Sequence, residues 1–273
     1  MKTLENHTLL YDEDCPMCNL YTSGFIKTKM LDSNGRKSFT TITSSEQVFI
    51  DVERAKNEIA LVDNENKKVF YGIESLLKVI GNSYPWMESI GNLKPVNFLL
   101  KQLYKFISYN RKVIAPSKIV SEKGLECIPT FNIKYRLSYI VFATLFTAII
   151  LLQYSQIIML LPKATFVREL LLAVGQIAFQ YLFIQKLSKQ SQLEYIGNLV
   201  TVSVIGSLIL TPVLVLSQFV HLNEYLILGW FGITVNLMIY EHFRRIKMLQ
   251  LPKTLTFTWV LYRMVALLLI LNL

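Results

Sequence analysis

Cysteine and histidine are scarce in this chain of 273 residues, which contains only three of each. A structural zinc site takes four ligands, and a disulfide scaffold takes several cysteine pairs. The histidines are scattered at His7, His221 and His242, and two of the cysteines, Cys15 and Cys18, are separated by two residues. The scarcity excludes a disulfide scaffold and leaves few ligands for zinc, so we expect no metal ion and no bound cofactor.

Acidic residues are also few, because 19 Asp and Glu stand against 28 Lys and Arg and give a net charge of +9. In a soluble protein such an excess of basic residues would suggest that the protein binds nucleic acid. Here the basic residues lie largely around long apolar spans, and no basic patch is interleaved with aromatic residues. We therefore expect no nucleic-acid partner and assign the excess charge to anionic lipid and to membrane topology.

The first residues, MKTLENHTLLYDED, lack the long apolar core and the small-residue cleavage site of a signal peptide. We therefore expect the N-terminal region to stay in the cytosol. In that compartment a Cys-x-x-Cys pair is more often catalytic than structural.

The N-terminal half is organised around two thiols that follow an apolar run. His7–Tyr11 predicts a short buried strand, an acidic turn follows, and the CPMC sequence at residues 15–18 opens a helical segment. The N-terminus of a helix carries unpaired N–H groups and a partial positive charge, which stabilise a thiolate. In this spacing Cys18 resolves a mixed disulfide formed at Cys15. Half of a metal site and two inert cysteines are the alternatives.

The run YDEDCPMC resembles the motif of the DCC family of predicted thiol-disulfide oxidoreductases, the domain of unknown function 393 group. The matching residues are Tyr11, Asp12, Asp14, Cys15, Pro16 and Cys18, with Glu13 where the family often has glycine. Further matches are Tyr71-Gly72, Tyr104 and Asn110-Arg111. The resemblance covers about Leu4 to Pro116 and implies an α/β thioredoxin-like fold with redox-active cysteines. In this interpretation Asp12 and Asp14 join the two thiols as catalytic residues that tune the pair or transfer protons, since carboxylates oppose thiolate formation.

Periodicity predicts the remaining elements of this domain. They are a helix over Cys18–Leu31, a strand over Lys37–Ile42, a helical piece ending near Ala55, strands over Glu58–Val62 and Lys67–Phe70, and helices over Ile73–Ile80 and Val96–Asn110. This order is that of a thioredoxin fold. Thioredoxins have a cis-proline before the third strand, but Glu58-Ile59 stands there, so the thioredoxin docking backbone is not carried over. We expect the apolar residues of the last helix, such as Phe98 and Leu103, to pack on the core and Arg111 to lie near the membrane surface.

The second half of the chain is rich in long apolar runs. They predict five membrane spans at Leu137–Leu161, Val167–Ile184, Tyr195–Phe219, Tyr225–Tyr240 and Leu255–Leu273. The predicted architecture is a domain over 1–116, a linker over 117–136 and a transmembrane helical domain over 137–273. Eight Lys and Arg residues flank the spans on the side of the N-terminal domain and two on the other, which predicts that this domain faces the cytoplasm. We expect an integral protein of a bacterial cytoplasmic membrane.

Two further residues have a functional and a plain interpretation. Cys127, just before the first span, is either a third redox thiol or an ordinary juxtamembrane or palmitoylated cysteine. Arg263 in the last span marks a site for an anionic or quinone-like ligand, or it is a helix-packing residue. A buried charge there needs a partner, and the candidates are Glu169, Glu194 and Glu241.

The residues favour a membrane-anchored thiol-disulfide oxidoreductase of the protein-disulfide reductase type. Its expected partners are a protein or small thiol or disulfide substrate and the lipid bilayer, and the oligomeric state stays open. The second hypothesis is a membrane transport or binding protein with a redox-sensing cytoplasmic domain. A third is an assembly or anchoring protein that uses the spans as a tether.

Overall fold

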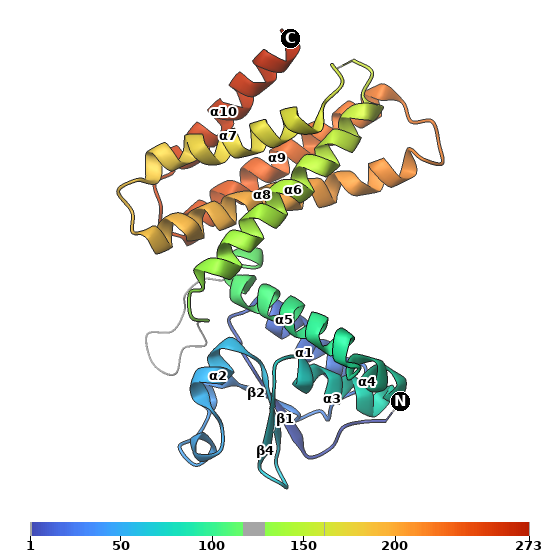
Figure 1. The fold of residues 1–273 in the computed structure, drawn as a ribbon, viewed down its shortest axis with the longest axis vertical. Coiled ribbons are helices and arrows are strands. Elements are labelled where there is room, and N and C mark those ends of the chain that lie inside the picture. The colour runs from blue at the N-terminus through green and yellow to red at the C-terminus, as the bar shows by residue number, and fades with distance from the viewer. Residues whose placement is uncertain (1, 117–128, 161, 273) are drawn as a thin grey trace. The chain divides into compact units, whose positions relative to one another are not determined.

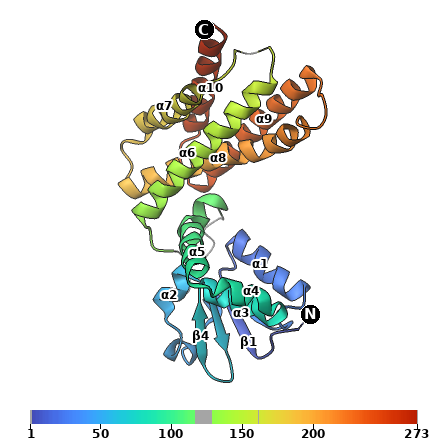
Figure 2. The ribbon, with the colours of Figure 1, turned by 45° about the vertical axis from the view of Figure 1, so that its right-hand side comes forward.

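The computed structural model describes residues 2–116, 129–160 and 162–272. The chain divides into two compact units, Met1–Tyr135 and Arg136–Leu273, which are described separately (Figure 1, Figure 2). The predicted boundaries at 116 and 137 stay a prediction, because most of the proposed linker lies outside the described residues.

A mixed four-stranded sheet forms the centre of the N-terminal unit, in the order β2-β1-β3-β4. The strands are β1 (His7–Tyr11), β2 (Arg36–Ser38), β3 (Ala60–Asp63) and β4 (Lys68–Tyr71). Strand β1 runs parallel to β2 and antiparallel to β3, and β3 runs antiparallel to β4. Together with the helices below, this is the topology of a thioredoxin-like fold, so the predicted fold class is confirmed.

Helices cover both faces of this sheet (Figure 2). They are α1 (Pro16–Lys27), α2 (Val52–Asn57), α3 (Ile73–Ser83), α4 (Pro85–Gly91) and α5 (Lys94–Ile114), with short 3-10 turns at Phe39–Thr41 and Glu46–Val48. Alternate residues of a strand point to opposite faces. Leu9 and Leu61 accordingly lie in one hydrophobic cluster, whereas Leu10 and Val62 lie in the other.

Helix α5 differs from the prediction in which of its faces is buried. The apolar residues Phe98 and Leu103 are exposed, whereas Ser108 and Arg111 are buried. The hydrogen bonds of Tyr104, Ser108 and Arg111 fix the rotation of the helix, whereas its hydrophobic pattern does not. The Arg111 side chain is thus buried within the N-terminal unit, and its expected place near the membrane surface stays a prediction.

The C-terminal unit consists of long helices that are apolar enough to cross a membrane. They are α6 (Ile133–Ile157), α7 (Phe166–Ile184), α8 (Lys189–Leu216), α9 (Glu224–Met248) and α10 (Thr254–Leu271). Their positions agree with the five predicted spans, and Pro212 lies inside α8 as expected. Helix α6 ends at Ile157, before Pro162, and Pro252 lies two residues before the start of α10, where its missing N–H is not needed.

Candidate dithiol site

The turn between β1 and α1 positions the two thiols. The backbone N–H of Cys15 donates to the carbonyl oxygen of Asp12 over 3.2 Å, and the N–H of Asp14 donates to the Asp12 carboxylate over 3.2 Å. Cys15 takes the N-cap position of α1 with φ −87° and ψ 113°, and Pro16 follows at the first helical position. Proline is suited to that position because its missing N–H is one that the helix leaves unpaired. The sulfur of Cys15 therefore lies at the positive end of the helix.

Both cysteines are reduced and almost fully buried, with 2% of Cys15 and 7% of Cys18 exposed. The thiol of Cys18 hydrogen-bonds Cys15. The hydroxyl of Tyr21 donates to Sγ of Cys18 over 3.7 Å. The two sulfurs are therefore in contact with each other while little of either reaches solvent.

The contact between the two thiols makes their pKa values differ, because it lowers the pKa of Cys15 and raises that of Cys18. The Cys18 hydrogen bond is the largest effect on Cys15 and lowers its pKa to about 6, a direction reinforced by the charge of Arg111 and opposed by burial and by Asp12. The pKa of Cys18 is raised, first by its hydrogen bond to Cys15 and then by burial. At neutral pH Cys15 is therefore a thiolate and Cys18 holds the shared proton, which is the division between an attacking and a resolving thiol.

Arg111 and Asp12 form an ion pair beneath the thiols. Nη2 of Arg111 lies 3.3 Å from Oδ2 of Asp12, and the two side chains are only 6% and 5% exposed. Their charges act on the Cys15 pKa in opposite directions. Arg111 matches the family motif, but its role beside the thiols was not expected from the sequence. Its spacing from Tyr104 and Ser108, which places three polar residues on one helix face, was the available signal.

Tyr104, Ser108 and Arg111 of α5 form hydrogen bonds with the backbone of the segment that leads into β3. The hydrogen bonds run from Ile59 N–H to the Tyr104 hydroxyl over 2.8 Å, from the Ser108 hydroxyl to the carbonyl oxygen of Asn57 over 2.5 Å, and from Arg111 Nη2 to the carbonyl oxygen of Lys56 over 3.1 Å. A thioredoxin has its cis-proline at this place. The described residues of this chain contain no cis peptide bond. Side chains of α5 instead form hydrogen bonds with the backbone groups of the segment.

A cavity of about 200 Å³ opens beside Cys18 within the N-terminal unit. Its polar edge includes Asp12, Cys18 and Arg111, and most of the remaining lining is apolar or aromatic, from β1, α1, α3 and α5. The Asp12 and Arg111 charges are paired with each other. The cavity therefore presents a thiol and an apolar surface without an excess of either charge.

The predicted site residues are brought together only in part. Asp12 contacts Arg111 and acts on the Cys15 pKa, as expected of a residue that opposes thiolate formation. Asp14 contributes its backbone N–H to the turn, and its carboxylate has no hydrogen bond or ion pair within the part of the chain that the structure describes. Cys127 lies outside the described residues, so its relay role stays a prediction. Among the described residues, no group of three or more His, Cys, Asp or Glu side chains is placed to hold a metal ion.

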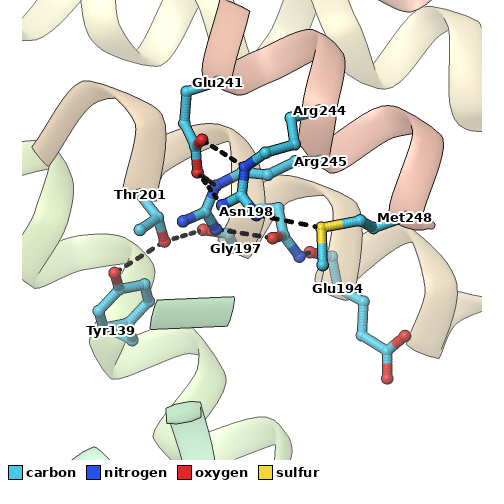
Figure 3. Close-up of polar contacts among 9 residues, drawn as sticks. All are labelled: Tyr139, Glu194, Gly197, Asn198, Thr201, Glu241, Arg244, Arg245 and Met248. Atoms are coloured by element: carbon cyan, nitrogen blue, oxygen red, sulfur yellow. Dashed lines mark hydrogen bonds and ion pairs between the residues drawn. The ribbon is translucent and has the colours of Figure 1, made fainter. Parts of the chain in front are cut away.

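Several polar residues of the membrane-helix unit contact one another. Glu241 accepts from Arg244 and Arg245, with Nη2 and Nε at 2.6 and 2.8 Å from its Oε1 (Figure 3). Arg245 also donates to the side-chain oxygen of Asn198 over 2.8 Å, which joins α9 to α8. Glu241 is therefore the ion-pair partner of both Arg244 and Arg245.

Arg263 has no ion pair with any of the three proposed acidic partners within the described residues. Its guanidinium carbon lies 5.5 Å from the ring centroid of Trp259, an arrangement typical of a cation–π contact. Glu169 pairs with Arg168 over 3.0 Å. Among the described residues the Trp259 ring contacts Arg263, and the proposed partner Glu169 acts on it as a charge without forming an ion pair.

Comparison with known proteins identifies the N-terminal unit. Residues 9–115 match the family model described as DCC1-like thiol-disulfide oxidoreductase. The matched range begins within β1 and contains the dithiol turn, the other three strands and all of α5. The chain matches no curated protein and no solved structure. The resemblance expected from the YDEDCPMC motif is confirmed. Residues 9–115 thus form a DCC1-like thiol-disulfide oxidoreductase domain, which is followed by five helices that are long and apolar enough to span a membrane.

Proposed function

We propose that this protein exchanges disulfides through its CPMC motif, with Cys15 and Cys18 as the redox pair. One observation carries the proposal. Cys15 lies buried at the N-cap of α1, and its side chain hydrogen-bonds a second thiol, Cys18, which lowers the Cys15 pKa. A buried cysteine without a function is normally protonated and inert.

The exchange proceeds in two steps. The Cys15 thiolate attacks a substrate disulfide, forms a mixed disulfide and releases one substrate sulfur as a thiolate. Cys18 then loses its proton to the released thiolate and attacks Sγ of Cys15, which expels the second substrate sulfur. The substrate disulfide gains two electrons, and the Cys15–Cys18 dithiol becomes a disulfide.

The ion pair of Asp12 and Arg111 supports this chemistry by positioning charge. Arg111 stabilises the Cys15 thiolate, and Asp12 limits that stabilisation. A thiolate with a very low pKa is a weaker nucleophile, so the balance keeps Cys15 both ionised and reactive near neutral pH. Asp14 is assigned to shaping the turn through its backbone N–H.

The distribution of basic residues supports a cytoplasmic location for this domain. The residues on its side of the five spans are Lys134, Arg136, Lys186, Lys189, Arg244, Arg245, Lys247 and Lys253, and those on the other side are Lys163 and Arg168. Short loops rich in Lys and Arg stay on the cytoplasmic side of a membrane. The spans then anchor the oxidoreductase domain to the inner face of the bilayer.

A redox titration of the purified full-length protein tests the proposal. The Cys15–Cys18 state is read by the mass shift after thiol alkylation, in buffers of defined thiol–disulfide ratio. We expect a reversible two-electron couple between about −120 and −300 mV, the range of working oxidoreductases. Cys15→Ser should abolish disulfide reduction, and Cys18→Ser should trap a mixed disulfide. A pair that never closes into a disulfide refutes the proposal.

The alternative function is transport or binding by the membrane helices, with the dithiol as a redox sensor. One observation favours it. Gln176 on α7 is only 2% exposed, and neither polar atom of its side chain has a hydrogen-bond partner in the described residues. Substrate uptake into vesicles that persists in Cys15→Ser but is lost in Arg263→Leu would support this function over disulfide exchange.

A further inference from the structure

We propose that the cavity beside Cys18 binds an uncharged, ring-sized group of a low-molecular-weight disulfide, and that such molecules are the substrate class of this dithiol. The inference rests on the proposed disulfide exchange and specifies what is exchanged. It follows from the size of the cavity, its lining and the burial of the thiols.

The volume of the cavity sets the size of the group that it accepts. An apolar cavity of about 150 Å³ holds one benzene molecule. The cavity beside Cys18 measures about 200 Å³ and thus holds one ring or a branched alkyl group of similar size. A tripeptide such as glutathione exceeds this volume, so only one part of it would enter.

The lining of the cavity selects against charge. Leu76, Ile59 and Ile107 are among its apolar residues, and the charged residues of the lining, Asp12 and Arg111, form an ion pair with each other. A carboxylate or ammonium group in the cavity would lose its hydration and would have to compete for a partner that is already paired. An uncharged aromatic or aliphatic group loses little hydration and buries its apolar surface.

The thiols themselves are difficult for a protein surface to reach. Cys15 and Cys18 are 2% and 7% exposed, and α5 covers the segment before β3 and takes up its backbone groups at Lys56, Asn57 and Ile59. An extended peptide therefore lacks those groups as hydrogen-bond partners. The cavity, in contrast, has Cys18 in its wall, and the Cys18 thiol contacts Cys15.

The reaction balances without any other reagent. With its ring in the cavity, the substrate R–S–S–R presents one sulfur to the Cys15 thiolate, which forms Cys15–S–S–R and releases RS⁻. Cys18 gives its proton to RS⁻ and displaces the second RS⁻ from Cys15, which takes a proton from solvent. Two thiols RSH leave, and the protein holds the Cys15–Cys18 disulfide.

The test compares three disulfides reacting with the reduced full-length protein under single-turnover conditions. They are dithiodipyridine with uncharged rings, dithiobis(nitrobenzoate) with anionic rings, and glutathione disulfide. Each rate constant is divided by that of free cysteine with the same disulfide, which removes differences in intrinsic reactivity. We expect this ratio to be highest for dithiodipyridine, by about tenfold or more, because burial of one ring stabilises the transition state by that factor.

Two variants of α5 locate the effect. Ile107 lines the cavity and is also partly exposed, so Ile107→Trp adds volume at the cavity wall from a position outside the buried core. Leu103 is an exposed residue of the same helix that does not belong to the lining, so Leu103→Trp is the matched control. We expect Ile107→Trp to lower the dithiodipyridine ratio about tenfold, and Leu103→Trp to leave it unchanged. Ile107→Ala, which enlarges the cavity, should raise the ratio for a disulfide with a larger, two-ring group.

The redox titration of the same samples separates the two proposals. A normal Cys15–Cys18 couple with equal ratios for all three disulfides, or with equal effects of the two tryptophan variants, overturns the substrate class and leaves disulfide exchange standing. The absence of a Cys15–Cys18 couple in the unmodified protein overturns disulfide exchange itself. An Ile107→Trp protein that lacks a normal couple is replaced by Ile107→Ala, whose failure to change the two-ring ratio also overturns the substrate class.

Discussion

At Cys15, three features of the chain act on one sulfur in the same direction. The N-cap position, the Cys18 thiol and the Arg111 guanidinium all favour the thiolate, whereas burial and Asp12 oppose it. The position of the two thiols was predictable because Cys-x-x-Cys after a short strand places them at a helix N-terminus. The ion pair was not predictable, since its partners, Asp12 and Arg111, are far apart in the sequence.

The first prediction at this scale concerns the pH dependence of Cys15. Because its folded-state pKa lies at about 6, below the ordinary value of 9.0, the thiolate predominates at pH 7 and is lost as the pH falls through 6. The alkylation rate of Cys15 by iodoacetamide should therefore rise with a midpoint near pH 6. Cys18→Ala removes the strongest stabilising contact and should move the midpoint upward. A midpoint near pH 9 in the unmodified protein would contradict this account.

The second prediction concerns the charges of the ion pair. Arg111→Gln leaves the Asp12 charge near the thiolate and should raise the Cys15 pKa, whereas Asp12→Asn should lower it. The double variant should lie between the two. Alkylation midpoints of the four proteins form a cycle that isolates the coupling of the two residues. Shifts of both single variants in the same direction would show that packing, and not charge, controls the thiol.

At the scale of elements, the sequence predicts where helices and strands occur. It predicts less well which face of each helix is buried. Strands β1, β3 and β4 and helix α3 lie close to their predicted positions, because apolar runs between turn residues define them well. Helix α5 is also predicted, but its buried face is not. The polar contacts of Tyr104, Ser108 and Arg111 with a distant segment decide its rotation, and a hydrophobic pattern contains no information about those contacts.

The third prediction tests this role of α5. Tyr104→Phe removes the hydroxyl that accepts the N–H of Ile59 and leaves that N–H without its partner, at a cost of about 1–3 kcal/mol. Hydrogen exchange of the Ile59 amide should therefore become faster. Leu103→Ala, at an exposed position of the same helix, should leave the exchange unchanged. Equal exchange rates in the two variants would mean that α5 does not hold this segment.

At the scale of the molecule, a DCC1-like oxidoreductase domain and a set of helices apolar enough to span a membrane occur in one chain. The apolar runs located all five helices, because a span of 17 to 25 apolar residues is a strong signal. Polar contacts within the helices were less predictable. Glu241 pairs with Arg244 and Arg245, so one of the three acidic residues proposed for Arg263 is engaged elsewhere. Sequence spacing along separate helices does not indicate which polar residues meet.

The last prediction concerns the orientation of the chain in the membrane. In a variant whose native cysteines are replaced by serine, Lys163→Cys marks the loop between α6 and α7, and Lys186→Cys marks the loop between α7 and α8. Both positions are exposed. Since basic loops stay in the cytoplasm, a membrane-impermeant maleimide should label Lys163→Cys in intact cells and should label Lys186→Cys only after the membrane is opened. The reverse pattern would place the dithiol outside the cytoplasm, where an oxidising environment would hold Cys15 and Cys18 as a disulfide and would make oxidation of substrate thiols the favoured direction of exchange.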